Sequence, residues 1–373
     1  MVGHVVVIGA GVYGAAVAAG LASRGARVTV VEAGAPASGT SGATFSWTNS
    51  CGKQPRSYHD LGVAGMVAHQ RLAARAPHSD WYHEGGNLEW AADADGVARL
   101  RRKVATVAEY GYAVRWLTRA EVLALEPDID PAAVPADEIA YFPREGWVEP
   151  TRLVGHLLAT ALSRGARLLR DDAVVDLDMG PTAALRLTSG KRVTADAVVN
   201  CAGPHATRIA ALAGLDLPMR NTLGVLIYTS PVPVSVARVV HAPNVHLRPD
   251  GGGRLLLHTH QVDAAARITG GRTRVDQDAV EVVLAAGRDL YPGLRDATVE
   301  SVRVGERPIP ADGLPVLGRV ADMPNFHFAV SHSGTTLSVH AGDLVAAEVL
   351  GENQDDVLGP FRYERFLPAL SAF

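Results

Sequence analysis

Residues 5–32 read VVVIGAGVYGAAVAAGLASRGARVTVVE, and this stretch decides the fold. The continuous apolar run at 5–8 predicts a strand that is buried on both faces, as in a parallel sheet. The alanine-rich residues that follow predict a helix to about Arg24, closed by Gly25, and residues 26–31 predict a second strand. A strand, a helix and a second strand in this order predict a βαβ unit at the start of the chain.

Three glycines join the first predicted strand to the helix with the spacing G-x-G-x-x-G. Gly9 makes the tight turn, Gly11 lets the backbone approach a pyrophosphate, and Gly14 lets helix and strand pack closely. The helix start at Val12 and Tyr13 offers free N–H groups and a partial positive charge to phosphates.

An acidic residue closes this unit. Glu32 lies near the spacing at which a carboxylate accepts hydrogen bonds from an adenosine ribose, and Ala33 follows it. The alternative is a glycine turn that is kept only for packing. The complete strand, helix, second strand and acidic end favour a dinucleotide site.

A small, hydroxyl-rich loop at 37–44 helps to distinguish a flavin from a nicotinamide nucleotide. Its backbone N–H groups can lie along phosphates and a ribityl chain, whereas the alternative is an ordinary solvent loop. The candidate cofactor-binding residues here are Ser38, Gly39, Thr40, Ser41, Gly42 and Thr44.

Two later segments also end in small residues, where a backbone can pass close to a ligand. The first is strand-rich, with strands predicted at 173–177 and 192–200, and it supplies the candidates Val174, Val175, Cys201, Ala202 and Gly203. The second is a strand at 326–330, a glycine loop and a helix to about Leu350. Its candidates are His332, Ser333, Gly334, Thr335, Thr336 and Leu337. This second segment aims another helix N-terminus at a bound group.

The whole set resembles the superfamily of FAD enzymes that contains D-amino acid oxidase, glycine oxidase and sarcosine oxidase. The matching pieces are the Gly9-Gly11-Gly14 fingerprint with Glu32, the 38–44 loop, the 198–203 strand, Arg307-Pro308 with Asp312-Gly313, and the helix start at 332–337. They are spread over nearly the whole chain in the family's order, and the last two are the more specific in combination.

The resemblance implies an α/β fold, α+β overall, in two domains. A Rossmann-like FAD-binding domain would be assembled from 1–45, 146–217 and 301–373. A substrate-binding domain at 46–145 and 218–300 would carry a large antiparallel β-sheet over the flavin. Within it, the run at 245–248, the turn at 249–253 and the run at 254–260 predict a hairpin.

The chemistry that the resemblance implies is transfer of a hydride from the carbon next to an amine to the flavin. A helix N-terminus at 335–337 would stabilise the negative charge of the reduced ring, with capping of the helix as the alternative role. Arg307, which is also a candidate cofactor-binding residue, lies where glycine oxidase-like members place an arginine that binds the substrate carboxylate. The alternatives for Arg307 are an ion pair with Glu306 or Asp312, or a backbone brace.

The predicted hairpin supplies further candidates. His246 and His258 would lie on neighbouring strands and accept a proton or hold substrate, or be ordinary structural histidines. Arg254 and His260 would share the face of His258, and Arg254 falls near the place of an oxygen-activating lysine in sarcosine oxidases. Lys53, just past the flavin loop, would supply positive charge during reoxidation, or face solvent.

Composition limits the class of protein. The chain has 373 residues, a net charge of −4, 47% hydrophobic and 20% charged residues, which is typical of a globular protein of two domains. We expect no nucleic-acid partner, because no basic stripe is present, and no membrane span. Cys51 and Cys201 are far apart and in no metal-ligand spacing, so we expect no metal, no disulfide framework and a cytoplasmic location.

The sequence therefore predicts an FAD-dependent oxidase of a small amine or amino acid, with O2 reduced to H2O2. The alternatives are a dehydrogenase that passes electrons to a quinone or carrier protein, a non-catalytic flavoprotein subunit or scaffold, and a nicotinamide dehydrogenase. We expect FAD to be non-covalent, since no cysteine lies near Arg307 and no histidine lies in 38–50; His332 is the residual candidate for a covalent link. The substrate, its stereochemistry and the oligomeric state are left open by the sequence.

Overall fold

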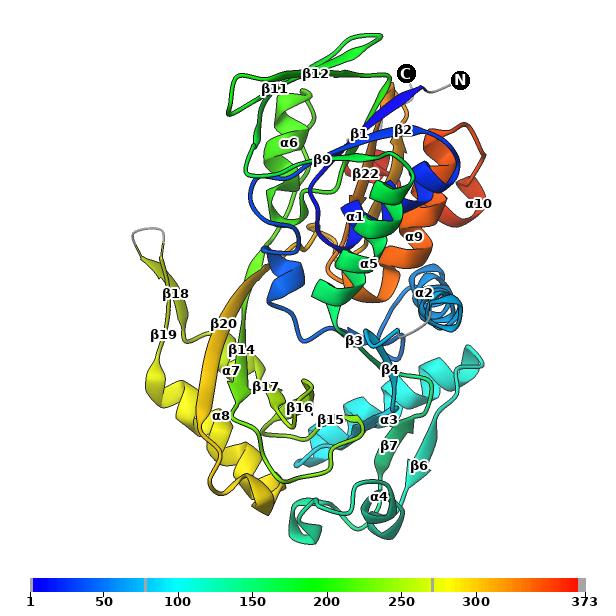
Figure 1. Ribbon diagram of the computed structural model, residues 1–373. Helices are drawn as coiled ribbons and strands as arrows, with labels where there is room; N and C mark the ends of the chain where they lie inside the picture. The colour runs from blue at the N-terminus through cyan, green and yellow to red at the C-terminus, as the bar shows by residue number, and fades with distance from the viewer. Residues whose placement is uncertain (1–2, 77–78, 270–271, 368–373) are drawn as a thin grey trace.

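The computed structural model describes residues 3–76, 79–269 and 272–367. Two large sheets occupy different halves of the molecule, and the chain crosses between them several times (Figure 1).

The βαβ unit predicted at the start of the chain is confirmed. It consists of β1 (His4–Ile8), α1 (Val12–Ser23) and β2 (Arg27–Val31), and the two strands are parallel. Gly25 closes the helix with φ of +82°, a value that glycine adopts without a steric penalty.

A six-stranded sheet contains this unit. Its order is β21 (Val316–Val320), β22 (Met323–Val330), β13 (Ala197–Asn200), β1, β2 and β9 (Arg167–Leu169). All neighbours are parallel except β21 and β22, which form a hairpin. The sheet therefore joins segments that are 300 residues apart in the chain.

The central strand β1 is covered on both faces, as its apolar run predicts. Val5 and Val7 pack in one core with α1, α5 (Pro150–Ser163) and α9 (Gly334–Val349). Val6 and Ile8 pack in a second core, against a three-stranded antiparallel sheet and α6 (Ala206–Leu212). That smaller sheet consists of β10 (Val174–Met179), β11 (Ala183–Leu187) and β12 (Arg192–Ala195).

The second large sheet has eight strands and is mainly antiparallel. Its order is β20 (Val299–Arg307), β14 (Thr222–Thr229), β17 (Leu255–His258), β16 (His246–Pro249), β15 (Val239–His241), β5 (Asn87–Glu89), β7 (Ile139–Phe142) and β6 (Arg115–Leu117). Only β15 and β5 run parallel. The mixed α/β class with a large antiparallel sheet is thus confirmed.

Helices and a small sheet complete the molecule. Four helices accompany the eight-stranded sheet: α3 (Ala94–Glu109), α4 (Arg119–Leu125), α7 (His260–Asp263) and α8 (Gln277–Leu290). The helix α2 (Arg56–Arg75) packs on α9, and the strands β3 (Trp47–Thr48), β8 (Gly146–Val148) and β4 (Tyr82–Glu84) form a small sheet between the two halves. The remaining elements are the strands β18 (Ala266–Thr269) and β19 (Arg272–Val275) and the short helix α10 (Asp355–Leu358).

The predicted hairpin is confirmed, and it brings two candidate histidines together. His246 and His258 are direct cross-strand partners of β16 and β17. The strand β17 ends at His258, and Thr259 caps the short helix α7 by accepting a hydrogen bond from Val262 N–H at 3.1 Å.

One strand departs from the expected division of the chain. β20 pairs with β14 along its whole length, so residues up to Arg307 belong to the eight-stranded sheet although residues from 301 on were expected in the nucleotide-binding domain. The expected domains also include 1–2, 77–78, 270–271 and 368–373, which lie outside the described residues. Among the described helices, none is both long and apolar enough to cross a membrane.

Candidate functional site

Two adjoining cavities lie between the two halves of the molecule. The smaller has a volume of about 390 Å³ and is lined by the glycine turn, the end of β2 and the start of α9. The larger has a volume of about 880 Å³ and lies over the eight-stranded sheet. Five residues line both cavities: Thr40, Thr44, Pro308, His332 and Thr335. The two cavities therefore meet, and together they suit one long ligand with two chemically different ends.

The glycine turn of the smaller cavity has no room for side chains. Gly9 has φ of +104°, and a Cβ on Gly9 would lie 2.5 Å from the carbonyl oxygen of Cys201. A Cβ on Gly14 would overlap the carbonyl oxygen of Gly9. The first N–H groups of α1 have no partner within the helix and are directed to this end. The turn is thus a cradle of backbone, of the kind that binds phosphates.

Glu32 has a second role beyond the one predicted for it. Its carboxylate accepts hydrogen bonds from Ala10 N–H at 2.7 Å and from Gly34 N–H at 2.9 Å. It therefore braces the glycine turn while lining the smaller cavity, where its side chain can also meet a ribose. Ser41 braces the same turn, because its hydroxyl oxygen accepts a hydrogen bond from Val12 N–H at 3.1 Å.

Most predicted cofactor-binding residues line one of the two cavities. The smaller cavity is lined by Gly9, Gly11, Val12, Tyr13, Glu32, Ala33, Ser38, Gly39, Thr40, Ser41, Thr44, Cys201, Ala202, Gly203, His332, Gly334 and Thr335. Ser333 and Thr336 line the larger cavity. Gly14, Gly42 and Leu337 lie beside these residues without lining either cavity.

Val174 and Val175 do not line either cavity. They lie on β10 of the three-stranded sheet, where Val174 is buried in the core against the six-stranded sheet. The residues just before β10 approach the smaller cavity, because Asp172 N–H donates to the carbonyl oxygen of Glu32 at 3.1 Å, and contact of either valine with the cofactor stays a prediction. The loop residues 204–205 and the strand end 329–331 also line the smaller cavity, and the sequence did not indicate them.

The start of α9 is held firmly against the smaller cavity. Tyr13 and Ser331 are joined by a hydrogen bond of 2.8 Å between their hydroxyl oxygens, and Tyr58 and Ser333 by one of 2.6 Å. A Cβ on Gly334 would lie 3.4 Å from the side chains of Val12 and Tyr13. The N-terminus of α9 is therefore fixed at the boundary of the two cavities.

Arg307 lines the larger cavity, where it is held on several sides. Its Nη1 donates to the carbonyl oxygen of Leu223 at 2.9 Å, and its Nη2 lies 2.8 Å from Asp263 Oδ2. The guanidinium lies flat on Gly224, where a Cβ would come within 2.6 Å of Nη2 and 2.8 Å of Nε. The predicted ion pair with Glu306 or Asp312 is replaced by one with Asp263, while the backbone brace is present.

Asp263 is a site residue that the sequence did not reveal. Its Oδ1 accepts a hydrogen bond from Val225 N–H at 2.7 Å, and its Oδ2 lies 3.2 Å from His258 Nε2. Desolvation raises its pKa, but the hydrogen bond to His258 and the charge of Arg307 together bring the pKa of Asp263 below its ordinary value. The carboxylate is therefore charged at neutral pH and orients both Arg307 and His258.

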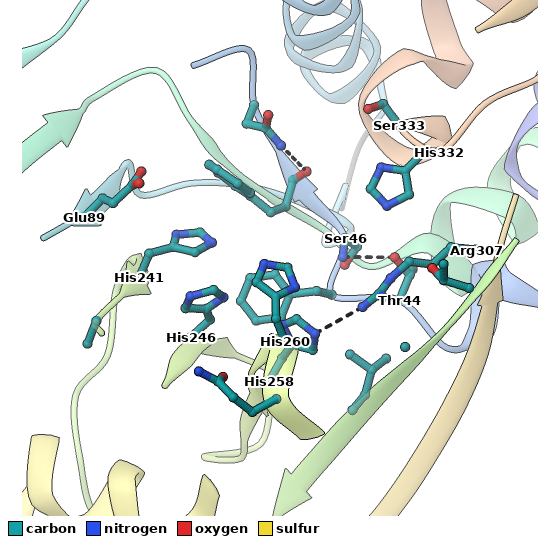
Figure 2. A pocket seen from close by; sticks show the side chains of 18 of the residues that line it. Thr44, Ser46, Glu89, His241, His246, His258, His260, Arg307, His332 and Ser333 are labelled. Atoms are coloured by element: carbon teal, nitrogen blue, oxygen red, sulfur yellow. Dashed lines mark hydrogen bonds between the residues drawn. The ribbon is translucent and has the colours of Figure 1, made fainter. Parts of the chain in front are cut away.

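A row of histidines forms one wall of the larger cavity (Figure 2). Ring centroids are separated by 4.5 Å between His241 and His246, 5.7 Å between His246 and His258, and 5.3 Å between His258 and His260. Burial, followed by repulsion from neighbouring histidines, lowers the pKa of His246 to about 3 and places that of His241 well below its ordinary value. These two rings are therefore neutral at pH 7.

His258, His260 and Asp263 also offer atoms that lie within 4.8 Å of one another, as metal ligands would. Arg307 Nη2, however, is 3.1 Å from His258 Nε2 and 2.8 Å from Asp263 Oδ2. A fixed cation already occupies the place where these ligand atoms converge, so we assign no metal to the group.

Two predicted catalytic residues lie away from the larger cavity. Lys53 is buried behind Asn49, where its ammonium donates to the backbone and side-chain oxygens of Asn49. Burial lowers the pKa of Lys53 to about 8, and the side chain does not line the larger cavity. Arg254 precedes β17, pairs with Glu300 at 2.7 Å on the protein surface and does not line the cavity either. The structure thus gathers Arg307, His246 and His258 but not Lys53 or Arg254.

The residues present fit an FAD molecule. The glycine turn, Glu32 and the 38–44 loop would hold the adenosine and pyrophosphate half in the smaller cavity. The N-terminus of α9 and the residues shared by both cavities would hold the flavin half. Gly9 and Gly14 support this assignment, because a Cβ at either position would collide with the backbone that forms the cradle.

Comparisons with known proteins agree with this assignment. The model of the family described as FAD dependent oxidoreductase matches residues 4–348. The glycine oxidase of Geobacillus kaustophilus is 29% identical over 375 residues, which cover 97% of each chain. The crystal structure of glycine oxidase from Geobacillus kaustophilus superimposes with a TM-score of 0.86 at 28% identity, covering 98% of this chain and 99% of that one. The crystal structure of iminodiacetate oxidase from Chelativorans sp. BNC1 superimposes with a TM-score of 0.81 at 26% identity, covering 96% of this chain and 98% of that one.

Proposed function

Because this chain belongs to the family of FAD-dependent oxidoreductases, we propose that it oxidises the C–N bond of a small amino acid. FAD, when bound, supplies the two-electron acceptor for such a reaction. The substrate loses a hydride and a proton and becomes an imine, which water hydrolyses. The two electrons pass to O2, which leaves as H2O2.

The observation that carries this proposal is the position of Arg307. It lines the larger cavity, next to Pro308, which also lines the smaller one. A guanidinium can bind a carboxylate through two parallel hydrogen bonds, and its charge is compatible with an anionic substrate. Asp263, Leu223 and Gly224 fix its plane, so that a carboxylate meets a donor that is already oriented.

The histidine wall supports a role in handling the amine. A substrate amine must be neutral to lose a hydride, and neutral imidazoles accept hydrogen bonds without adding positive charge beside it. His246 is neutral at pH 7 because its burial lowers its pKa to about 3. We propose that His246 and His258 contact the substrate, and that Lys53 and Arg254 do not contact it directly.

The relatives favour an oxidase. Glycine oxidase and iminodiacetate oxidase are both named as oxidases and are similar over nearly their whole length. The second candidate is a dehydrogenase with the same first half-reaction, which passes the electrons to a quinone or carrier protein. This second candidate is supported by a relative named D-amino acid dehydrogenase 2, from Mesorhizobium japonicum, which is 26% identical over 263 residues. A non-catalytic flavoprotein subunit or scaffold is the third.

Anaerobic bleaching of the flavin separates these functions. The protein is mixed without oxygen with a panel of D- and L-amino acids, glycine, N-methyl amino acids and cyclic amines, and the flavin absorption is followed. We expect bleaching by at least one amino acid, followed by rapid recovery and one H2O2 per flavin when O2 is admitted. Slow recovery would identify the dehydrogenase, and no bleaching by any member would contradict the proposal.

We further propose that FAD is held without a covalent bond, that the cytoplasm is the site of action, and that the domain boundaries are those predicted except that β20 belongs to the substrate domain. Both cysteines are buried and free, which suits a reducing compartment. Precipitation of the protein with acid tests the first point, since non-covalent flavin stays in the supernatant.

A further inference from the structure

His241 lies at the end of the histidine wall that is farther from Arg307, and its environment differs from that of the other histidines (Figure 2). Its Nδ1 lies 2.7 Å from Asn87 Oδ1, and Asn87 Nδ2 lies 3.2 Å from Glu145 Oε2. Asn87 and Glu145 are completely buried, and His241 is 8% exposed. The three side chains form a line from the protein interior to the wall of the larger cavity.

The direction of the hydrogen bonds in this line is fixed by Glu145. Its Oε1 accepts from Ser50 N–H and Cys51 N–H, both at 3.1 Å, and its Oε2 accepts from the indole N–H of Trp47 at 3.0 Å. Backbone and indole N–H groups only donate, so Glu145 acts as an acceptor throughout. Asn87 must therefore turn its NH2 group to Glu145 and its carbonyl oxygen to His241.

This arrangement selects one tautomer of His241. Asn87 Oδ1 can only accept, so His241 Nδ1 carries the proton and His241 Nε2 carries a lone pair. Among the described residues, none makes a hydrogen bond with His241 Nε2, while the ring lines the larger cavity. Trp47 packs on the ring with centroids 4.2 Å apart and limits its rotation. A polar atom that is oriented, nearly buried and without a partner here indicates a ligand that donates to it.

The place of His241 relative to Arg307 sets the size of that ligand. Arg307 contacts His258 on β17, and His241 lies on β15, with β16 between them. Arg307 comes from β20, on the side of β17 opposite to β15, and its Nη2 lies 3.1 Å from His258 Nε2. Neighbouring strands are about 4.8 Å apart, so the guanidinium and His241 are roughly 13 Å apart. Two hydrogen bonds of about 2.9 Å, one at each end, leave about 7 Å between a carboxylate oxygen and the terminal donor, which a side chain of about four atoms spans.

We propose that His241 Nε2 accepts a hydrogen bond from the far end of the substrate, and that the substrate is an amino acid whose side chain ends in an N–H or O–H donor. Asn87 and Glu145 are positioning residues that hold His241 in the accepting tautomer. This inference rests on the proposed function, because Arg307 must hold the carboxylate for His241 to meet the side chain. It excludes glycine as the preferred substrate, since glycine has no group that reaches β15.

Three amino acids of equal length test the inference: norleucine, 5-hydroxynorvaline and ornithine, each as D and L forms. Their side chains end in a methyl, a hydroxyl and an ammonium group. Dissociation constants are measured without oxygen from the change in flavin absorption, and rates from its bleaching. We expect the hydroxyl and ammonium members to bind about tenfold more tightly than norleucine, as one hydrogen bond provides.

Variants of His241 locate the source of this preference. His241→Phe keeps a ring against Trp47 but has no acceptor, so the preference should vanish while norleucine binds as before. His241→Gln can donate to Asn87 and still present an oxygen to the cavity, so it should retain part of the preference. His156→Phe is the matched control, because His156 stacks on Trp81 and does not line the cavity.

The positioning role of Asn87 has its own readout. Nitrogen NMR of histidine-labelled protein should show His241 with a protonated Nδ1 and an unprotonated Nε2, and Asn87→Leu should convert this to a mixture of tautomers. A merely structural role of Asn87 would leave the tautomer unchanged.

Three results would overturn the inference. They are equal affinity of the wild type for all three amino acids, a preference that survives in His241→Phe, and a protonated Nε2 in the wild type. Failure of the proposed function looks different: no amino acid would then bleach the flavin, whereas the absorption titration would still rank the three ligands.

Discussion

The two cavities differ in the groups that line them: the smaller presents mainly backbone groups, and the larger presents mainly side chains. In the smaller, the glycine turn and the N-termini of α1 and α9 present backbone groups, and Gly9 and Gly14 are required because backbone lies against them. In the larger, the lining groups are side chains that come from β14, β15, β16, β17, α7 and β20. A backbone cradle can be predicted from local sequence, whereas a wall of side chains cannot, because it depends on which distant strands become neighbours.

A glycine-to-alanine substitution should therefore have different effects in the two cavities. We expect Gly14→Ala, at the smaller cavity, to have the largest effect of all the variants considered. The new methyl group would overlap a carbonyl oxygen of the backbone, which cannot move without breaking the turn. We expect a loss of more than about 3 kcal/mol in the free energy of unfolding, together with loss of bound FAD. Denaturant unfolding and the flavin content of the purified protein measure these.

Gly155→Ala is the control for this prediction. Gly155 lies on α5, and a Cβ there would meet nothing within 4 Å. We expect a gain of about 0.5–1 kcal/mol, since alanine is the better helix former. Equal stability of the two variants would contradict the role given to Gly14.

Asp263→Asn tests the side-chain wall and should have the next largest effect. The amide keeps an acceptor for Val225 N–H but turns a donor towards Arg307, which loses its charge partner. We expect kcat/KM for the preferred amino acid to fall about 30-fold, mainly through KM, with FAD still bound. Asp289→Asn, at an exposed position, is the control and should leave both kcat/KM and the bound FAD unchanged. Loss of FAD by Asp263→Asn would contradict the assignment of Asp263 to the larger, substrate-binding cavity.

The nucleotide-binding half should also respond to acid, through His327 on β22. Burial lowers the pKa of His327 to about 4, so between pH 4 and 6.5 the unfolded chain binds more protons than the folded one. Stability should therefore fall as the pH falls through this window, with a contribution of about 2 kcal/mol at pH 5 from His327 alone.

His327→Gln should remove that part of the pH dependence. Unfolding of both proteins is followed between pH 7.5 and 5, and the difference in their free energies should be constant at the upper end and change at the lower. A constant difference over the whole range would show that His327 titrates normally.

Gly224→Ala should have the smallest effect of the four. Its methyl group would meet the tip of Arg307, a flexible side chain that can move, rather than backbone. We expect a folded, FAD-containing protein in which KM for the amino acid rises about tenfold, because the guanidinium is displaced. A stability loss as large as that of Gly14→Ala would erase the distinction between the two cavities.

The sequence predicts the backbone cradle well because its signals are local. Gly9, Gly14 and Glu32 lie within one βαβ unit, and the hairpin of His246 and His258 is encoded by a single turn. The surroundings of Val174 could not be predicted in this way, because an apolar strand does not indicate which face of the large sheet it covers.

The side-chain contacts of the larger cavity could not be read in this way. Asp263 meets Arg307 only because β14 brings β17 and β20 to its two sides. His241 meets Asn87 across 154 residues, and Asn87 meets Glu145 across 58. The strand β15 has only three residues, which is too short for a periodicity to indicate that its last residue, His241, faces a cavity.

The most direct test of the account is whether Arg307 recognises a carboxylate. The wild type and Arg307→Met are compared in anaerobic flavin reduction by an amino acid and by the amine that lacks only its carboxyl group. We predict that the wild type prefers the amino acid by at least about 100-fold in kcat/KM, and that Arg307→Met loses this preference while retaining FAD. Equal reduction of the wild-type flavin by amine and amino acid would contradict the account.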